Sequence, residues 1–155
     1  CQITTVRRQD KPLPGSHRTV TIEQLHRVLP ETDLLVIAAA LTEHTRNLIG
    51  REELALLPVG ARIVNVARGS LVETDALVEA LASGHLGGAA LDVTAPEPLP
   101  EGHPLWSAPG VLITPHQADT PEMTRPLLYE RIAENTRAFL SDGDFIGKVD
   151  TEAGY

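Results

Sequence analysis

Apolar residues along the chain gather in five short runs, and helix signals lie between them. The runs are Gln2–Val6, Leu34–Ala38, Arg62–Val66, Ala89–Val93 and Val111–Thr114. Most of them are continuous rather than alternating, which is typical of parallel strands that are covered on both faces. The pattern therefore predicts five strands of one parallel sheet.

Helices are predicted in the segments between these strands. Thr21–Gln24 has the capping-box pattern and opens a helix that ends near Leu29. Arg51–Leu57 makes a short helix, and Thr74–Ser83 makes another with Gly84 as its C-cap. Strands that alternate with helices in this way predict an α/β fold with a doubly wound parallel sheet.

A longer helix is predicted after the last strand. Thr120 is a suitable N-cap, Pro121 suits the first helical position, and the helix is expected to run to about Leu140. Pro126 lies inside this segment, so it is expected to kink the helix or to delay its start. The residues from Gly147 onwards are expected to form a tail.

Composition narrows the class of protein. A chain of 155 residues with 42% hydrophobic and 3% aromatic residues predicts a soluble domain, or part of a larger one, with an aliphatic core. The net charge of −8 argues against a nucleic-acid or anionic-membrane surface. Cys1 is the single cysteine and offers neither a disulfide nor a metal cluster, and no signal peptide or membrane span is visible, so a cytoplasmic location is expected. Because Cys1 opens the chain close to a strand, these residues are expected to be the carboxyl-terminal part of a longer protein.

Polar residues follow three of the predicted strands. Arg68 comes after Arg62–Val66, Asp92 and Glu97 lie at and beyond the end of the next strand, and His116 follows the last one. Open parallel sheets bind ligands at the carboxyl ends of their strands. An arginine binds a carboxylate through two hydrogen bonds, and a histidine transfers protons near neutral pH. Each residue alone also fits a structural reading, but their coincidence predicts a site for a 2-hydroxy acid.

The motifs around these residues resemble a known family. Asn65–Gly69 reads Asn-Val-Ala-Arg-Gly, Leu91-Asp-Val93 precedes Pro96-Glu-Pro-Leu-Pro100, and Ile113–His116 reads Ile-Thr-Pro-His. In order and spacing these blocks resemble the D-isomer-specific 2-hydroxy acid dehydrogenases, in particular those that act like glyoxylate/hydroxypyruvate reductases. Leu41–Ile49 is similar to a further segment of the family.

The resemblance implies a role for each residue of the site. Arg68 would bind the substrate carboxylate and polarise the keto group, His116 would be the acid/base, and Glu97 would orient His116. Asp92 would contact the nicotinamide carboxamide. Other positions that the resemblance places near the cofactor are Ala39, Ala40, Thr45, Val66 and Ala67, together with Arg68 and His116. It implies no metal.

The chain also departs from the family pattern. The glycine-rich phosphate loop Gly-x-Gly-x-x-Gly is absent from the sequence and would precede Cys1. The expected fold is thus a Rossmann-type doubly wound sheet that lacks its first strand and this loop. Residues 1–118 would form an incomplete dinucleotide-binding domain, and residues 119–155 a helix and tail that return to a substrate domain. Ala40 replaces a usual proline, and Gln117-Ala-Asp119 replaces a commoner run of small residues.

The choice of cofactor is predicted from Val6-Arg7-Arg8. In a dinucleotide fold an acid at the end of the second strand binds the ribose 2′-hydroxyl of NAD, whereas an arginine accommodates the 2′-phosphate of NADP. No acid follows this strand until Asp10. We therefore expect NADP to be preferred to NAD, with Arg7 rather than Arg8 on the phosphate and with His17 or Arg18 as unplaced helpers. The alternative is that both arginines are solvated loop cations.

Three functional hypotheses fit these residues. The first is an oxidoreductase that transfers a hydride between NAD(P)H and C2 of a small 2-keto or 2-hydroxy acid, as a homodimer without nucleic-acid or membrane partners. The second is a nicotinamide-sensing interaction protein on the same fold, like the carboxyl-terminal-binding corepressors, because a fold does not fix a function. The third is a non-catalytic dinucleotide-binding fragment.

Overall fold

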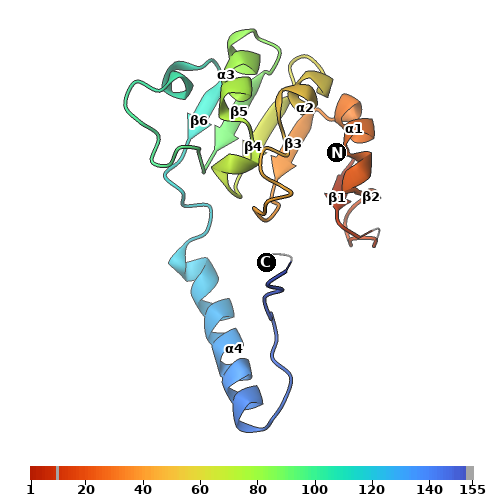
Figure 1. The fold of residues 1–155 in the computed structure, drawn as a ribbon, viewed down its shortest axis with the longest axis vertical. Helices are drawn as coiled ribbons and strands as arrows, with labels where there is room; N and C mark the ends of the chain where they lie inside the picture. Colours follow the sequence, from red (N-terminus) through yellow and green to blue (C-terminus); the bar gives the residue numbers. More distant parts are fainter. Residues whose placement is uncertain (10, 153–155) are drawn as a thin grey trace.

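The computed structural model describes residues 1–9 and 11–152, and its centre is a four-stranded parallel sheet (Figure 1). The strands are β3 (Leu34–Ile37), β4 (Arg62–Asn65), β5 (Gly88–Leu91) and β6 (Val111–Ile113), and they lie side by side in chain order. Ile37 is level with Asn65, and Asn65 is level with Leu91. The carboxyl ends of these neighbouring strands therefore meet at one edge of the sheet.

A second, smaller sheet contains β1 (Thr4–Arg7) and β2 (Arg18–Thr21), which pair in parallel. The sequence analysis missed β2, because its four residues include a single apolar one, Val20. The helix predicted from Thr21 is also wrong as one continuous element. It is divided into η1 (Ile22–Gln24), α1 (Leu25–Val28) and η2 (Leu29–Glu31), although Gln24 Oε1 accepts the Thr21 N–H at 3.2 Å as the capping pattern requires.

The other helices agree with the sequence predictions. They are α2 (Arg51–Leu56), α3 (Thr74–Ala82) and α4 (Pro121–Leu140), with the short 3-10 turns η3 (Gly69–Leu71) and η4 (Pro104–Ser107) between strands. Gly84 has a φ of +75°, as its C-cap position demands. Pro126 lies inside α4 and does not delay its start. The predicted strands were each misplaced by one or two residues at an end, since residues such as Val66 have already turned into the following loop.

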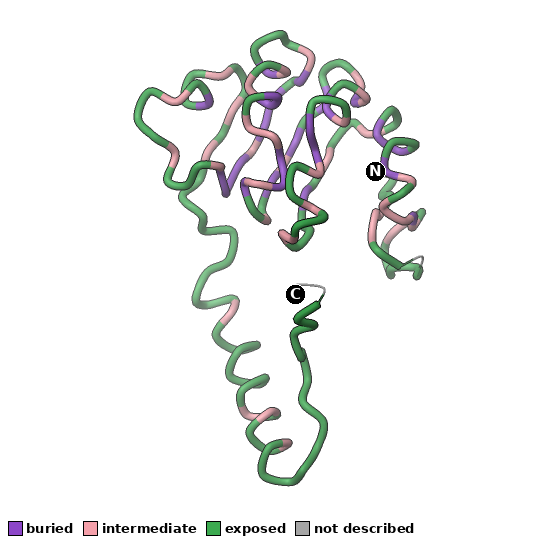
Figure 2. Tube along the Cα trace, in the orientation of Figure 1, coloured by how far each residue is buried: buried purple, intermediate pink, exposed green. Residues whose placement is uncertain are grey.

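Side chains on one face of the four-stranded sheet form the core. Ile63 and Leu91 are buried there with Leu54 of α2 and with Leu77 of α3. Side chains that point to the other face are half-buried, like Val64, or exposed, and Leu34 and Val36 each keep 55% of their surface. In the described residues, α2 and α3 contribute to one buried cluster on one face of the sheet (Figure 2).

Helix α4 extends away from the sheets and contains no buried residue (Figures 1 and 2). Its last part contacts the tail, where the Asn135 side chain binds the backbone of Ile146 through both its oxygen and its nitrogen. Its exposed apolar side chains include Leu127, Leu128, Ile132, Phe139 and Leu140. None of the described helices is both long enough and apolar enough to cross a membrane.

Candidate active site

The turn after β4 is built by a buried amide and a glycine. The Asn65 side chain accepts the Ala67 N–H at 3.0 Å and donates to the Arg68 carbonyl oxygen at 2.9 Å. Gly69 then passes so close to the next strand-end loop that an added Cβ would lie 2.0 Å from the Thr94 carbonyl. The sequence Asn-Val-Ala-Arg-Gly therefore folds into one tight turn that presents Arg68 at the edge of the sheet.

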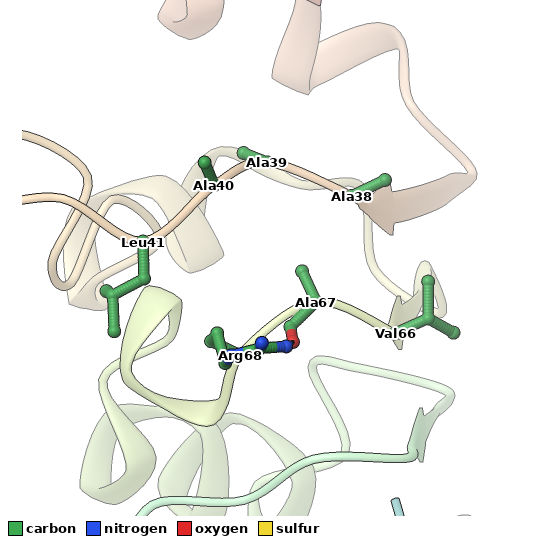
Figure 3. A pocket seen from close by; sticks show the side chains of 7 residues that line it. All are labelled: Ala38, Ala39, Ala40, Leu41, Val66, Ala67 and Arg68. Atoms are coloured by element: carbon green, nitrogen blue, oxygen red, sulfur yellow. Dashed lines mark hydrogen bonds between the residues drawn. The ribbon is translucent and has the colours of Figure 1, made fainter. Parts of the chain in front are cut away.

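A cavity of about 500 Å³ opens between this turn and the segment after β3 (Figure 3). Ala38–Leu41 form one wall and Val66–Arg68 form the other. The Arg68 side chain folds back across its own turn, so that Nη1 donates to the Ala67 carbonyl oxygen at 2.6 Å. The predicted cofactor residues Ala39, Ala40, Val66, Ala67 and Arg68 thus line one cavity.

Thr45 supports a wall of this cavity without lining it. Its hydroxyl donates to the Ala40 carbonyl oxygen at 2.7 Å and accepts the Thr42 N–H at 2.7 Å. These bonds close the turn after Ala40, the residue that replaces a proline usual in the family, and they hold the Ala40 backbone in place. The structure therefore brings Thr45 to the site as a support of its backbone.

His116 and Glu97 form a pair. His116 Nδ1 lies 2.6 Å from Glu97 Oε1, and the two side chains keep 43% and 38% of their surface. The His116 backbone has a φ of +54°, which is uncommon for a residue other than glycine. With Nδ1 engaged by the carboxylate, Nε2 is the ring nitrogen that remains for a ligand.

Asp92 holds the loop that carries His116. It is 7% exposed, Oδ1 accepts from the Thr114 hydroxyl at 2.5 Å and from the Gln117 N–H at 2.9 Å, and Oδ2 accepts the Ala118 N–H at 2.7 Å. The hydrogen bond from Thr114 does most to lower the pKa of Asp92, against the opposing effect of burial, and the two backbone N–H groups add to it. Asp92 is therefore an ionised residue that orders the His116 loop.

The two turns are also joined directly. The Asp92 N–H donates to the Asn65 carbonyl oxygen at 3.0 Å, so the residue that holds the Arg68 turn is bonded to the residue that holds the His116 loop. Sequence reasoning did not assign either supporting role. The available signal is a polar residue, Asn65, that directly follows the apolar pair Ile63-Val64 at the end of β4.

The arginines predicted to select the cofactor lie in the smaller sheet. Arg7 ends β1 and donates from Nη1 to the Lys11 carbonyl oxygen at 3.2 Å, and Arg8 follows it. The proposed helpers are engaged as well, since His17 Nδ1 accepts the Ile3 N–H and Arg18 lies 3.4 Å from Glu31. None of these side chains lines the cavity between Ala38 and Arg68. Asp10, the first acidic residue after β1, lies outside the described residues.

In the described part of the chain, no group of three or more His, Cys, Asp or Glu side chains is arranged to hold a metal ion. What the edge of the sheet does offer is a guanidinium, a histidine with a carboxylate partner, and a small-residue cavity. They lie at the carboxyl ends of the strands, where doubly wound α/β sheets bind their ligands.

Comparison with known proteins identifies the family. The model of the NAD binding domain of D-isomer specific 2-hydroxyacid dehydrogenases matches residues 1–118, and the chain belongs to this family. It is 41% identical over 149 residues to glyoxylate/hydroxypyruvate reductase A of Salmonella paratyphi B, covering 96% of this chain and 47% of that protein. The chain spans about half the length of the first curated relatives that it matches.

Solved structures agree with this fold. A D-isomer specific 2-hydroxyacid dehydrogenase from Xanthobacter autotrophicus Py2, in complex with NADPH and MES, matches with a TM-score of 0.88 and 39% identity, over 98% of this chain and 62% of that one. An NADPH-dependent glyoxylate/hydroxypyruvate reductase from Sinorhizobium meliloti, in complex with NADP and sulfate, matches with a TM-score of 0.90 and 30% identity, over 99% of this chain and 49% of that one. The Rossmann-type fold expected from the sequence is confirmed.

Proposed function

We propose that the protein containing this chain reduces a small 2-keto acid, of the glyoxylate or hydroxypyruvate kind, to the D-2-hydroxy acid with a nicotinamide cofactor. The observation that carries the proposal is the 2.6 Å contact between His116, which follows β6, and Glu97, which follows β5, at the same sheet edge as Arg68 after β4. The named relatives support it, since they include a glyoxylate/hydroxypyruvate reductase.

The residues present fit a nicotinamide. Ala38, Ala39, Ala40 and Ala67 are small and leave the cavity open, as a dinucleotide that passes close to the backbone requires. When bound there, the cofactor supplies the hydride that goes to C2 of the keto acid. The residues that line this cavity would contact the cofactor, and Thr45 would hold the Ala40 backbone behind them. Asp92 would contact the carboxamide of the nicotinamide.

The protein's own groups deal with charge and protons. Arg68 exchanges its bond to the Ala67 carbonyl for a two-point bond to the substrate carboxylate, and its charge polarises the adjacent keto group. His116, in its imidazolium form, gives the Nε2 proton to the oxygen that develops negative charge at C2. Glu97 holds Nδ1 and stabilises that imidazolium. The proton and the hydride together complete the alcohol.

NADPH is proposed as the preferred form of the cofactor. Arg7 at the end of β1 would bind the 2′-phosphate, with Arg8 beside it. The relatives from Xanthobacter autotrophicus Py2 and Sinorhizobium meliloti, whose structures are complexes with NADPH and NADP, support this choice. Comparing kcat/KM for NADPH and NADH, first in the intact protein and then in Arg7→Asp, tests it. Equal or better use of NADH by the unchanged protein would contradict the proposal.

Residues 1–118 are proposed to be an incomplete dinucleotide domain, and residues 119–155 a helix and tail that pack on a substrate domain. A dinucleotide sheet has the strand order 3-2-1-4-5-6. In this order the first strand lies between the second and the fourth. If β1 and β2 are the second and third strands and β3 is the fourth, the position of the first strand lies between β1 and β3. The separation of the two sheets, the exposed Leu34 and Val36, and the unburied helix α4 all support this division.

Turnover is the decisive test. The full-length protein, incubated with NADPH and either glyoxylate or hydroxypyruvate, is expected to oxidise the cofactor and to form the hydroxy acid. NADPH that binds without turnover of either acid would contradict the reductase and favour a nicotinamide-sensing interaction protein. His116→Ala serves as the control for any background oxidation.

A further inference from the structure

We propose that Asn65 is a positioning residue of this reaction, which fixes the direction of Arg68 without touching the substrate. The proposal rests on the proposed function, because it assigns Asn65 to the substrate-binding half of that site. It concerns a residue that is 1% exposed and closes β4 between β3 and β5.

The Asn65 amide holds the turn at two successive residues. Oδ1 accepts the N–H of Ala67, and Nδ2 donates to the carbonyl oxygen of Arg68. One of these groups lies before the Arg68 Cα and the other lies after it. The backbone that directs the Arg68 side chain is therefore fixed on both sides by one buried residue.

Few side chains can do this at that depth. The position needs one donor and one acceptor on a short stem, and Asn supplies both while Gln is a methylene longer. Asp at this place would offer acceptors alone and would set a negative charge against the Arg68 carbonyl oxygen. An apolar residue would remove the acceptor of the Ala67 N–H and one of the two donors to the Arg68 carbonyl oxygen, which also accepts the Leu71 N–H at 3.2 Å. The loss of a partner for a part-buried backbone N–H is costly.

The backbone of Asn65 has a separate task. Its carbonyl oxygen accepts the Asp92 N–H at 3.0 Å, and this bond continues the β4–β5 ladder whatever side chain is present. A substitution of the Asn65 side chain is therefore expected to disturb the Arg68 turn more than the His116 loop. That separation makes the proposal testable.

A double-mutant cycle in the full-length protein is the test. Asn65→Asp is expected to lower kcat/KM for the keto acid by about tenfold, the equivalent of one hydrogen bond lost at the site. Arg68→Ala lowers it further, and Asn65→Asp in the Arg68→Ala background is then expected to add less than about twofold, because the two changes remove the same interaction. Full additivity of the two losses would overturn the proposal.

Asn135→Asp is the matched control. Asn135 also binds one backbone segment through both ends of its amide, at 2.9 and 3.1 Å to Ile146, but it lies on the exposed helix α4. It is expected to leave kcat/KM unchanged. If Asn65→Asp fails to fold, Asn65→Ser replaces it in the cycle, since a hydroxyl retains one of the two hydrogen bonds.

The outcomes separate this inference from the proposed function. Absence of turnover in the unchanged protein contradicts the proposed function itself. Turnover with an additive cycle contradicts the role of Asn65 alone. Turnover with a non-additive cycle, a raised KM for the keto acid and a normal Asn135→Asp variant supports Asn65 as the residue that positions Arg68.

Discussion

The two halves of the candidate site are held in place by different chemistry. A neutral amide, Asn65, holds the turn of Arg68, and it does so within three residues of itself. A carboxylate, Asp92, holds the loop of His116, which lies 24 residues further along the chain. Both supports are buried at strand ends, but the support of the His116 loop depends on ionisation and that of the Arg68 turn does not.

This difference teaches which half is local and which is tertiary. The Arg68 turn is held by side-chain hydrogen bonds within the five consecutive residues from Asn65 to Gly69. The His116 loop requires β5 and β6 to be paired first, because Asp92 must meet Thr114 and the backbone beyond it. The acid/base half of the site is therefore expected to be the more sensitive to changes elsewhere in the fold.

The largest effect is expected from the removal of His116. His116→Ala should lower kcat by about 10²- to 10⁴-fold, the range for loss of a general acid, while cofactor affinity stays within a few fold. Steady-state kinetics and cofactor titration measure both. His26→Ala is the matched control, because His26 is also exposed and also lies 2.6 Å from a glutamate, Glu53, but in α1.

A smaller loss is expected from the Arg68 half. Arg68→Ala should lower kcat/KM by about ten- to a hundredfold, because a charge-assisted pair contributes roughly 1.5–3 kcal/mol. Arg68→Lys keeps the charge but loses the two-point geometry, so it is expected to recover only part of this loss. Near-normal kinetics in Arg68→Ala would show that Arg68 does not bind the substrate. The site would then not consist of an Arg68 half and a His116 half.

These expectations show how far the sequence carries the argument. The strand ends at Arg68 and His116 and the helix Pro121–Leu140 follow from local patterns, and the structure places them accordingly. Strand β2 and the uncovered face of the sheet do not follow, because a short mixed strand has a weak pattern and an apolar run does not reveal what covers it.

The supports of the site were also beyond the sequence. The bonds of Asp92 reach residues 22 to 26 positions away, and they exist only once β5 and β6 lie side by side. The Asn65 amide acts locally, yet its role depends on burial that no single residue reveals. Hydrogen bonds between residues distant in the sequence cannot be predicted from local sequence patterns.

Neutralising Glu97 tests the acid/base half more gently. Glu97→Gln keeps an oxygen for His116 Nδ1 but loses the negative charge that favours the imidazolium, so turnover should fall by about tenfold, near the value of one charge-assisted hydrogen bond. Glu101→Gln, an exposed residue of the same loop region, is the control. An equal loss in both variants would mean that Glu97 is a loop residue without a role in proton transfer.

The smallest effect concerns stability, and it separates the two supports most directly. The pKa of Asp92 is lowered in the folded protein, mainly by the Thr114 hydroxyl, so its ionised form stabilises the fold at any pH above the ordinary aspartate value of about 3.9. That contribution is lost as the pH falls through the lower, folded value. Asp92→Asn should therefore reduce the denaturant midpoint at neutral pH, and its difference from the unchanged protein should shrink in acid. Asn65→Ala removes a neutral support, so its destabilisation should stay constant over the same pH range. If the loss of stability in the two variants depended on pH in the same way, the difference between an ionised and a neutral support would be contradicted. Both residues would then act as neutral hydrogen-bonding groups.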